Sequence, residues 1–111
     1  MDPRQAVPEV LAADVPDQAV LVDVREDDEW AAGHAPGARH IPLGEIGARH
    51  GEIPRDRAVY VICRSGSRSA HAAQALTAAG WEALNVADGM MGWEAVGRPM
   101  TTESGSAPFV A

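Results

Sequence analysis

The 111-residue chain contains no lysine, so nine arginines supply all of its fixed positive charge against sixteen acidic residues. The resulting formal net charge of −7 argues against nucleic acid or an anionic membrane surface as a general partner. No apolar run approaches the roughly 20 residues of a membrane span, and residues 1–5 lack the layout of a signal peptide. We therefore expect a cytoplasmic monomer that binds neither nucleic acid nor membranes.

Cysteine is almost absent as well. Cys63 is the single cysteine, which excludes an internal disulfide and fits a reducing compartment. A chain of this length with 46% hydrophobic residues suits one domain with one core. We assign residues 1–100 to that domain and residues 101–111, which are small and polar, to a loosely attached C-terminal tail.

Short apolar runs alternate with helix-like segments along the chain. Strands are expected at residues 19–24, 39–41, 58–63 and 81–86, and helices at residues 8–13, 25–33, 43–51, 69–80 and 91–96. This alternation, with short turns between the segments, indicates βαβ units. The predicted fold is therefore α/β, with a mostly parallel sheet between helices on both faces in three α/β/α layers.

The lone cysteine opens a loop between an expected strand and an expected helix, with the sequence Cys63-Arg64-Ser65-Gly66-Ser67-Arg68-Ser69. At such junctions the loop N–H groups and the first helical turn converge on one spot, which binds anions and favours a thiolate. In open α/β sheets, ligands gather at the carboxyl ends of strands. We interpret Cys63 as a reactive cysteine, with Arg64 and Arg68 available for an oxyanion and Ser69 as a possible helix cap.

Other chemistries fit this sequence poorly. A nucleotide-binding P-loop requires a lysine. The histidines, His34, His40, His50 and His71, have a spacing that matches no zinc pattern with Cys63, so we predict no metal site. No histidine is placed locally to pair with Cys63, so the loop itself must lower the pKa of the thiol.

The chain resembles the single-domain rhodanese (sulfurtransferase) family over about residues 5–100. Three segments carry the resemblance. The first runs from Leu21-Val22-Asp23-Val24-Arg25 through Glu29-Trp30 and Gly33-His34-Ala35-Pro36-Gly37-Ala38 to Ile41-Pro42-Leu43. The second is the cysteine loop, and the third is Asp88-Gly89-Met90 with Trp93, Gly97 and Pro99.

The resemblance implies a five-stranded parallel sheet and a cysteine that cycles through a persulfide, without a cofactor. Cys63 would take a sulfur from a small anionic donor such as thiosulfate and pass it to cyanide, a thiol or a protein. The substrate-binding set would be the rest of the loop: Arg64, Ser65, Gly66, Ser67, Arg68 and Ser69.

The resemblance also gives expectations for residues outside the loop. We expect Asp23 and Arg25 to support the sheet edge by ion pairing, and His34 to fix a turn. We expect Trp30, Met90, Met91 and Trp93 to serve core packing rather than to wall the pocket. Many family members have two glycines where this chain has Gly89-Met90, so Met90 could narrow the active-site pocket.

Other functions on the same fold are open at this stage. A cysteine phosphatase or arsenate reductase of the related cell-cycle type needs five residues between its cysteine and arginine, whereas four separate Cys63 from Arg68. A non-enzymatic sulfur carrier or regulatory module would keep the fold without rapid turnover. A mercaptopyruvate-using enzyme would tend to have a small residue at the position of Arg64.

Overall fold

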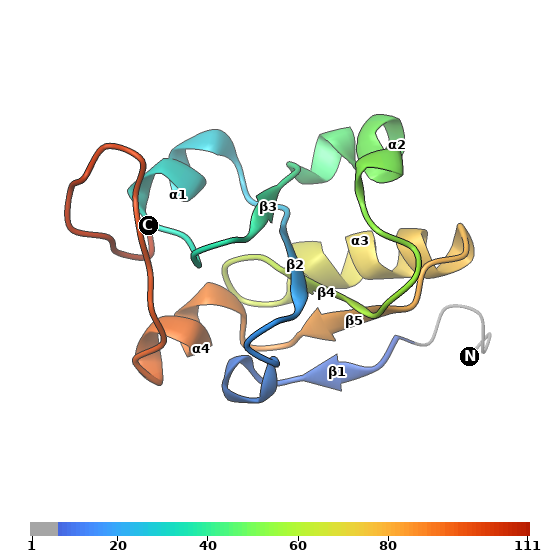
Figure 1. Ribbon diagram of the computed structural model, residues 1–111, viewed down its shortest axis with the longest axis horizontal. Coiled ribbons are helices and arrows are strands. Elements are labelled where there is room, and N and C mark those ends of the chain that lie inside the picture. The colour runs from blue at the N-terminus through green and yellow to red at the C-terminus, as the bar shows by residue number, and fades with distance from the viewer. Residues whose placement is uncertain (1–6) are drawn as a thin grey trace.

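Five parallel strands form one sheet in the computed structural model, which describes residues 7–111 (Figure 1). Their order across the sheet is β1-β5-β4-β2-β3. The strands are β1 (Glu9–Val10), β2 (Val20–Asp23), β3 (Arg39–His40), β4 (Val59–Ile62) and β5 (Ala83–Val86). Every neighbouring pair is parallel, which confirms the predicted sheet. The prediction for residues 1–5 lies outside the described residues.

Helices cover both faces of this sheet because its central strands are apolar on both sides. One face packs against α2 (Ile46–Arg49) and α3 (Ser67–Ala78), and its core includes Val22, Val59, Val61, Ile46, Ala72, Ala73 and Leu76. The other packs against α4 (Gly89–Ala95) and the 3-10 turn η2 (Ala12–Asp14), through Leu21, Ile62, Val86, Met90, Trp93 and Ala12. The three-layer α/β/α prediction is confirmed.

Shorter elements complete the chain. Helix α1 (Asp27–Ala32) follows β2, and the 3-10 turns η3 (Leu43–Glu45) and η4 (His50–Glu52) flank α2. Between residues 7 and 111, no helix is both long enough and apolar enough to cross a membrane.

The predicted helix at residues 8–13 is wrong. These residues form the edge strand β1 followed by η2. The backbone N–H of Asn85 donates to the Pro8 carbonyl at 2.9 Å, and that of Ala87 donates to the Val10 carbonyl at 2.9 Å. Pairing with a strand some 75 residues away therefore outweighs the local helix signal.

Helix α3 begins at Ser67, earlier than predicted, and its N-cap is Gly66. Ser69 does not cap the helix. It lies within the first turn, fully buried, with its hydroxyl directed at Cys63. The small residues Ala72 and Ala73 let this helix lie close to the sheet.

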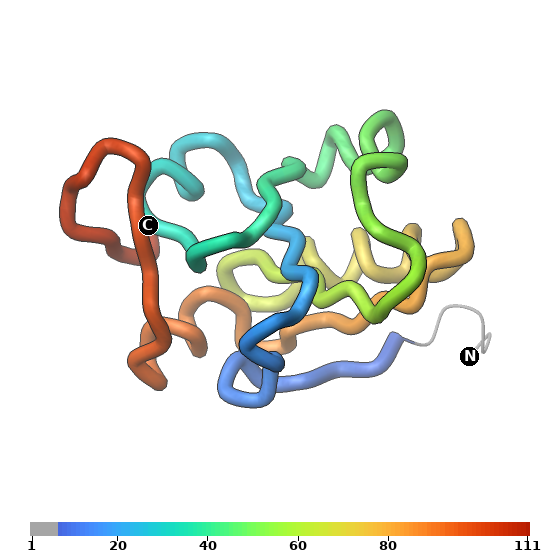
Figure 2. The backbone as a smooth tube through the Cα atoms, viewed as in Figure 1, coloured from blue at the N-terminus to red at the C-terminus, as the bar shows by residue number. Residues whose placement is uncertain are grey.

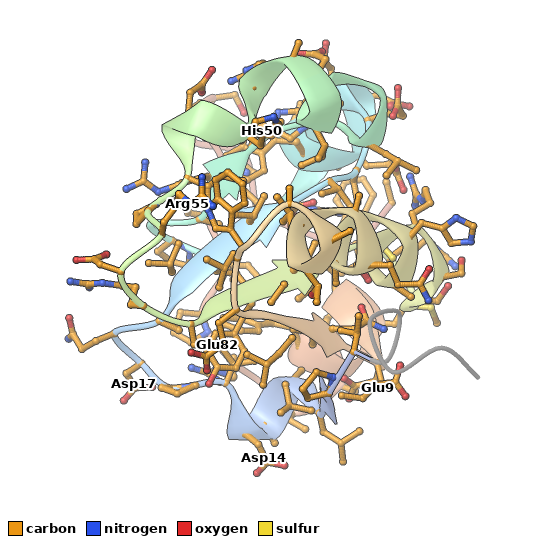
Figure 3. The ribbon with its side chains drawn as sticks, turned by 90° about the vertical axis from the view of Figure 1, so that its right-hand side faces the viewer. Glu9, Asp14, Asp17, His50, Arg55 and Glu82 are labelled. Atoms are coloured by element: carbon orange, nitrogen blue, oxygen red, sulfur yellow. The ribbon has the colours of Figure 1, made fainter. Side chains whose placement is uncertain are left out.

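Trp81 fixes the end of the sheet opposite Cys63. The edge of His50 meets its ring at 5.1 Å, and the Arg55 guanidinium lies over the ring at 4.1 Å; Figure 3 labels both residues. Arg55 also donates to the Ala79 carbonyl at 3.0 Å. The end of α3 is thereby tied to the loop that leads into β4.

The C-terminal segment is attached more firmly than predicted (Figure 2). Thr101 and His34 exchange two backbone hydrogen bonds of 2.8 and 3.0 Å, and the Phe109 N–H donates to the Ala32 carbonyl at 3.0 Å. A Cβ on Gly33 would lie 2.7 Å from the Phe109 carbonyl oxygen. The segment is held because backbone meets backbone at a residue without a side chain.

Gly33→Ala tests this attachment. Gly33 has φ 162°, an extended conformation that alanine adopts, so the cost comes only from contact with the C-terminal segment. We expect amide hydrogen exchange at Thr101 and Phe109 to accelerate roughly tenfold. Gly47→Ala is the matched control, since a Cβ there meets nothing within 4 Å. Unchanged exchange in Gly33→Ala would contradict the tight contact.

Candidate active site

Cys63 follows the last residue of β4, and its sulfur is enclosed by the loop that leads into α3. The Gly66 N–H donates to Sγ at 3.1 Å, and the Ser69 hydroxyl oxygen lies 3.2 Å from Sγ. Cys63 has no exposed surface, while Arg64 and Ser65 around it are exposed. The predicted site residues therefore lie together at the carboxyl edge of the sheet.

Two opposing effects act on the thiol. Burial raises the pKa of Cys63, whereas hydrogen bonds from the Ser69 hydroxyl and from the amides of Ser69, Gly66 and Ser65 lower it. The hydrogen bonds prevail, so the pKa of Cys63 lies below its ordinary value. The site favours a thiolate without a histidine base.

Two glycines allow the loop to take this shape. Gly66 has φ 102°, and a Cβ there would overlap the Ala87 carbonyl oxygen. Gly89 has φ 59°, and its Cβ would lie 2.5 Å from the Arg64 carbonyl oxygen. The α4 amides cap the loop, since the Met90 N–H donates to the Cys63 carbonyl at 2.8 Å. Neither glycine has room for a side chain.

Met90 does not narrow the loop. Its side chain is fully buried in the core on the α4 face, in the cluster that contains Ile62 and Val86. Gly89 makes the close approach to the loop, and Met90 contributes only its backbone N–H there. The Met90 side chain points into the core, so methionine at this position does not narrow the active-site pocket.

The two loop arginines have different surroundings. Both terminal nitrogens of Arg68 bind Glu29, at 2.7 and 2.8 Å, in a bidentate ion pair with α1. Arg64 is exposed, and its Nε donates to the Ala111 carbonyl oxygen at 3.0 Å. Arg68 thus joins the loop to α1, and Arg64 faces solvent.

Asp23 and Arg25 form a fully buried ion pair of 2.9 Å at the end of β2. Arg25 also donates to the Gly33 carbonyl at 2.8 Å, and His40 Nε2 lies 2.7 Å from the Arg25 carbonyl oxygen. These contacts hold the segments that enter and leave α1. Neither side chain bonds to the Cys63 sulfur.

His34 and Trp30 form a second support beside α1. Their rings stack at 3.5 Å, and His34 Nδ1 bonds to the Trp30 carbonyl at 2.8 Å. Trp93 is buried in the core, whereas Met91 is 46% exposed, so its predicted packing role is wrong. Among residues 7–111, no group of three or more His, Cys, Asp or Glu side chains could hold a metal ion.

Two residues of the site were not predicted. Glu29 pairs with Arg68, and Asn85 accepts from the Ser69 hydroxyl at 2.6 Å. Glu29 belongs to the first segment of the family resemblance, but nothing in its acidic helix start indicates a partner in the cysteine loop. Asn85 could have been predicted to make a buried hydrogen bond, because a polar side chain inside an apolar strand needs a partner.

The Glu29–Arg68 ion pair predicts an acid-sensitive contribution to stability. Arg68 lowers the pKa of Glu29 from 4.5 to about 2, so the contribution is complete above about pH 4.5 and is lost as the pH falls toward 2. We expect Glu29→Gln to lower the free energy of unfolding by about 1–3 kcal/mol at pH 7 and to flatten its decline between pH 5 and 2. Denaturant titrations at each pH measure both.

Glu45→Gln is the control for that prediction, because it removes an ion pair to Arg49 at the exposed surface. Such pairs contribute little, so its pH dependence should match that of the unmodified protein. If the pH dependence of Glu29→Gln also matched that of the unmodified protein, the partly buried Glu29–Arg68 pair would not stabilise the fold.

Comparison with known proteins agrees with this geometry. The model of the rhodanese-like domain family matches residues 7–96. The chain is 39% identical over 94 residues to "Putative sulfurtransferase YtwF" of Bacillus subtilis, covering 85% of this chain and 89% of that protein. It is 42% identical over 74 residues to "Putative sulfur carrier protein YrkF" of the same organism, covering 66% of this chain and 40% of that protein.

A solved structure shows the same fold. The rhodanese-related protein of Thermoplasma volcanium superposes with a TM-score of 0.81 at 30% identity, over 86% of this chain and 99% of that one. The family match spans the sheet, the cysteine loop and α4. The chain belongs to the rhodanese-like domain family, whose relatives support sulfur transfer as its general activity.

Proposed function

We propose that the protein is a sulfurtransferase that carries sulfur from thiosulfate, or a similar dianionic donor, as a persulfide on Cys63. The Cys63 thiolate attacks the outer sulfur of thiosulfate. A new S–S bond forms to Cys63, the S–S bond of the donor breaks, and sulfite leaves with its electron pair. An acceptor such as cyanide or a thiol then attacks the outer sulfur of the persulfide, and the Cys63 thiolate is restored.

The observation that carries this proposal is a buried sulfur that receives hydrogen bonds from its own loop. The Gly66 N–H at 3.1 Å and the Ser69 hydroxyl at 3.2 Å offset the cost of burying a thiolate. Loop amides can stabilise a persulfide anion in the same way. A reaction in two displacements passes through both the Cys63 thiolate and the Cys63 persulfide, and the loop has donors for each of these anions.

Arg64 is the residue best suited to bind the donor. Arg64 directly follows Cys63 in the chain and is exposed, and among residues 7–111 only its Nε has a hydrogen-bond partner, the Ala111 carbonyl. The planar terminal nitrogens match a sulfur oxyanion. Arg68 contributes positive charge near the sulfur while Glu29 holds it in place. A donor with two negative charges is therefore favoured over mercaptopyruvate.

Intact-mass spectrometry tests the intermediate directly. After exposure to thiosulfate and removal of excess donor, we expect the mass to increase by one sulfur atom, because Cys63 is the only thiol. Cyanide should remove that sulfur and release thiocyanate. Cys63→Ser should show neither change while keeping its fold. Hydrolysis of an aryl phosphate in place of sulfur transfer would indicate the phosphatase alternative instead.

Arg64→Ala should reduce kcat/KM for thiosulfate by roughly tenfold to a hundredfold, the loss expected for one charge-assisted contact. Most of the loss should be an increase in KM, because the persulfide chemistry at Cys63 is untouched. Arg57→Ala is the control, since Arg57 precedes β4 and lies at its other end. Steady-state thiocyanate formation measures both variants, and equal values for the two would exclude Arg64 as the donor site.

A sulfur carrier is the second candidate, favoured by the name of the relative YrkF. A carrier would form the same Cys63 persulfide but release it quickly only to a protein acceptor. Rates of persulfide loss to cyanide, small thiols and acceptor proteins separate the two functions. Fast loss to small thiols supports an enzyme, and loss to a protein alone supports a carrier.

A further inference from the structure

The Ser69 hydroxyl lies between two groups that both need its proton. Its oxygen is 3.2 Å from Cys63 Sγ and 2.6 Å from Asn85 Oδ1. A hydroxyl group carries one proton and can donate one full hydrogen bond. Ser69, Cys63 and Asn85 are each at most 1% exposed, so bulk solvent does not reach any of the three groups.

The orientation of the Asn85 amide is fixed by its other end. Its Nδ2 donates to Glu9 Oε2 at 3.0 Å and to the Gly66 carbonyl at 3.0 Å. Both partners are acceptors, so a flipped amide would set its oxygen against two oxygens. Asn85 Oδ1 must therefore face Ser69. Glu9, labelled in Figure 3, supplies one of the two contacts from the edge strand β1.

The two protonation states of Cys63 use the Ser69 proton differently. With a thiol, Cys63 S–H can donate to Ser69 Oγ while Ser69 donates to Asn85, and every group has a partner. A thiolate keeps the hydrogen bonds of the loop amides, but it gains the one from the Ser69 hydroxyl only if that proton turns away from Asn85. Asn85 Oδ1 then loses its donor in a buried site. The competition therefore favours the thiol.

We propose that Asn85 is a positioning residue that restrains the ionisation of Cys63 by competing with its sulfur for the single proton of Ser69. The inference concerns the same cysteine as the proposed function and rests on that function only for its biological meaning. Its test contains no sulfur donor or acceptor. A failed sulfur-transfer assay and a failed test of Asn85 are therefore separate results.

Substitution of Asn85 removes one hydrogen bond from the exposed Glu9 carboxylate and leaves the other charged groups around the sulfur with their own partners. Arg68 on α3 is held by Glu29 of α1, and Arg64 faces solvent from the loop. Asp23 is paired with Arg25 at the end of β2. Two further carboxylates lie on neighbouring elements. Glu9 on β1 bonds to Asn85 itself, and Asp88 before α4 accepts from the Ala12 N–H at 2.8 Å. A shift in the titration of Cys63 that appears only when Ser69 is present thus reports the Asn85 oxygen, because an effect of the freed Glu9 carboxylate would not require Ser69.

The experiment is a double-mutant cycle read by the pH dependence of the ultraviolet absorbance of the Cys63 thiolate, with Cys63→Ser as the blank, since this chain has a single thiol. Absorbance reports ionisation without requiring a reagent to reach the buried sulfur. Asn85→Leu frees the Ser69 proton, and we expect the pKa of Cys63 to fall by roughly 0.5–1 unit. Ser69→Ala removes a hydrogen-bond donor to the thiolate and should raise the pKa of Cys63. In the Ser69→Ala background, Asn85→Leu should cause no further change.

Two outcomes overturn the proposal. An unchanged or higher pKa in Asn85→Leu would show that the amide does not restrain ionisation. An equal fall with and without Ser69 would show that Asn85 acts by holding Gly66 instead. Circular dichroism establishes that each variant folds, and if Asn85→Leu does not fold, Asn85→Ala removes the same oxygen without added bulk.

Discussion

The contact between the cysteine loop and its two neighbouring backbones is the constraint on which the site depends. Gly66 lies against the Ala87 carbonyl and Gly89 against the Arg64 carbonyl, with no space for a Cβ at either place. Because α4 amides take the Cys63 and Arg64 carbonyls, the Gly66 N–H is left to face the sulfur. Thiolate stabilisation here comes from the path of the backbone, and a small side chain at either glycine would change that path.

Of the two arginines in the cysteine loop, Arg68 is held in an ion pair and Arg64 has no carboxylate partner among the described residues. Asp23 takes the guanidinium of Arg25 inside the fold, and Glu29 takes that of Arg68 at the loop. Both ion pairs fix segments around α1, since Arg25 also bonds to the Gly33 carbonyl. In an acidic chain with no lysine, this arrangement leaves Arg64 as the exposed positive charge of the cysteine loop.

Local patterns predicted the parts of the fold that local interactions decide. The apolar runs at residues 19–24 and 58–63 are strands because they are buried on both faces, and the cysteine loop lies at their carboxyl edge. Contacts between distant residues were not visible in the same way. The strand Glu9–Val10 exists only through pairing with β5.

The attachment of the C-terminal segment depends on the missing side chain of Gly33, and the Glu29–Arg68 pair joins residues 39 positions apart. Neither has a sequence pattern of its own. The expectation that Ser69 caps the helix was wrong for a local reason. A serine at a helix start suggests a cap, but α3 begins early enough to turn this hydroxyl inward, where it meets Cys63 and Asn85.

Competition for the Ser69 proton limits how far the loop lowers the pKa of Cys63, which strong hydrogen-bond donors alone would not do. A thiolate becomes less nucleophilic as the pKa of its thiol falls, so a loop that lowered this pKa without limit would form an abundant but sluggish thiolate. Hydrogen bonds from the amides of Ser65 and Gly66 lower the pKa of Cys63 and so favour its ionisation. Asn85 opposes that ionisation by accepting the Ser69 proton. Because Asn85 lies on β5 and is oriented from β1 by Glu9, the reactivity of the cysteine is linked to the sheet edge as well as to its own loop.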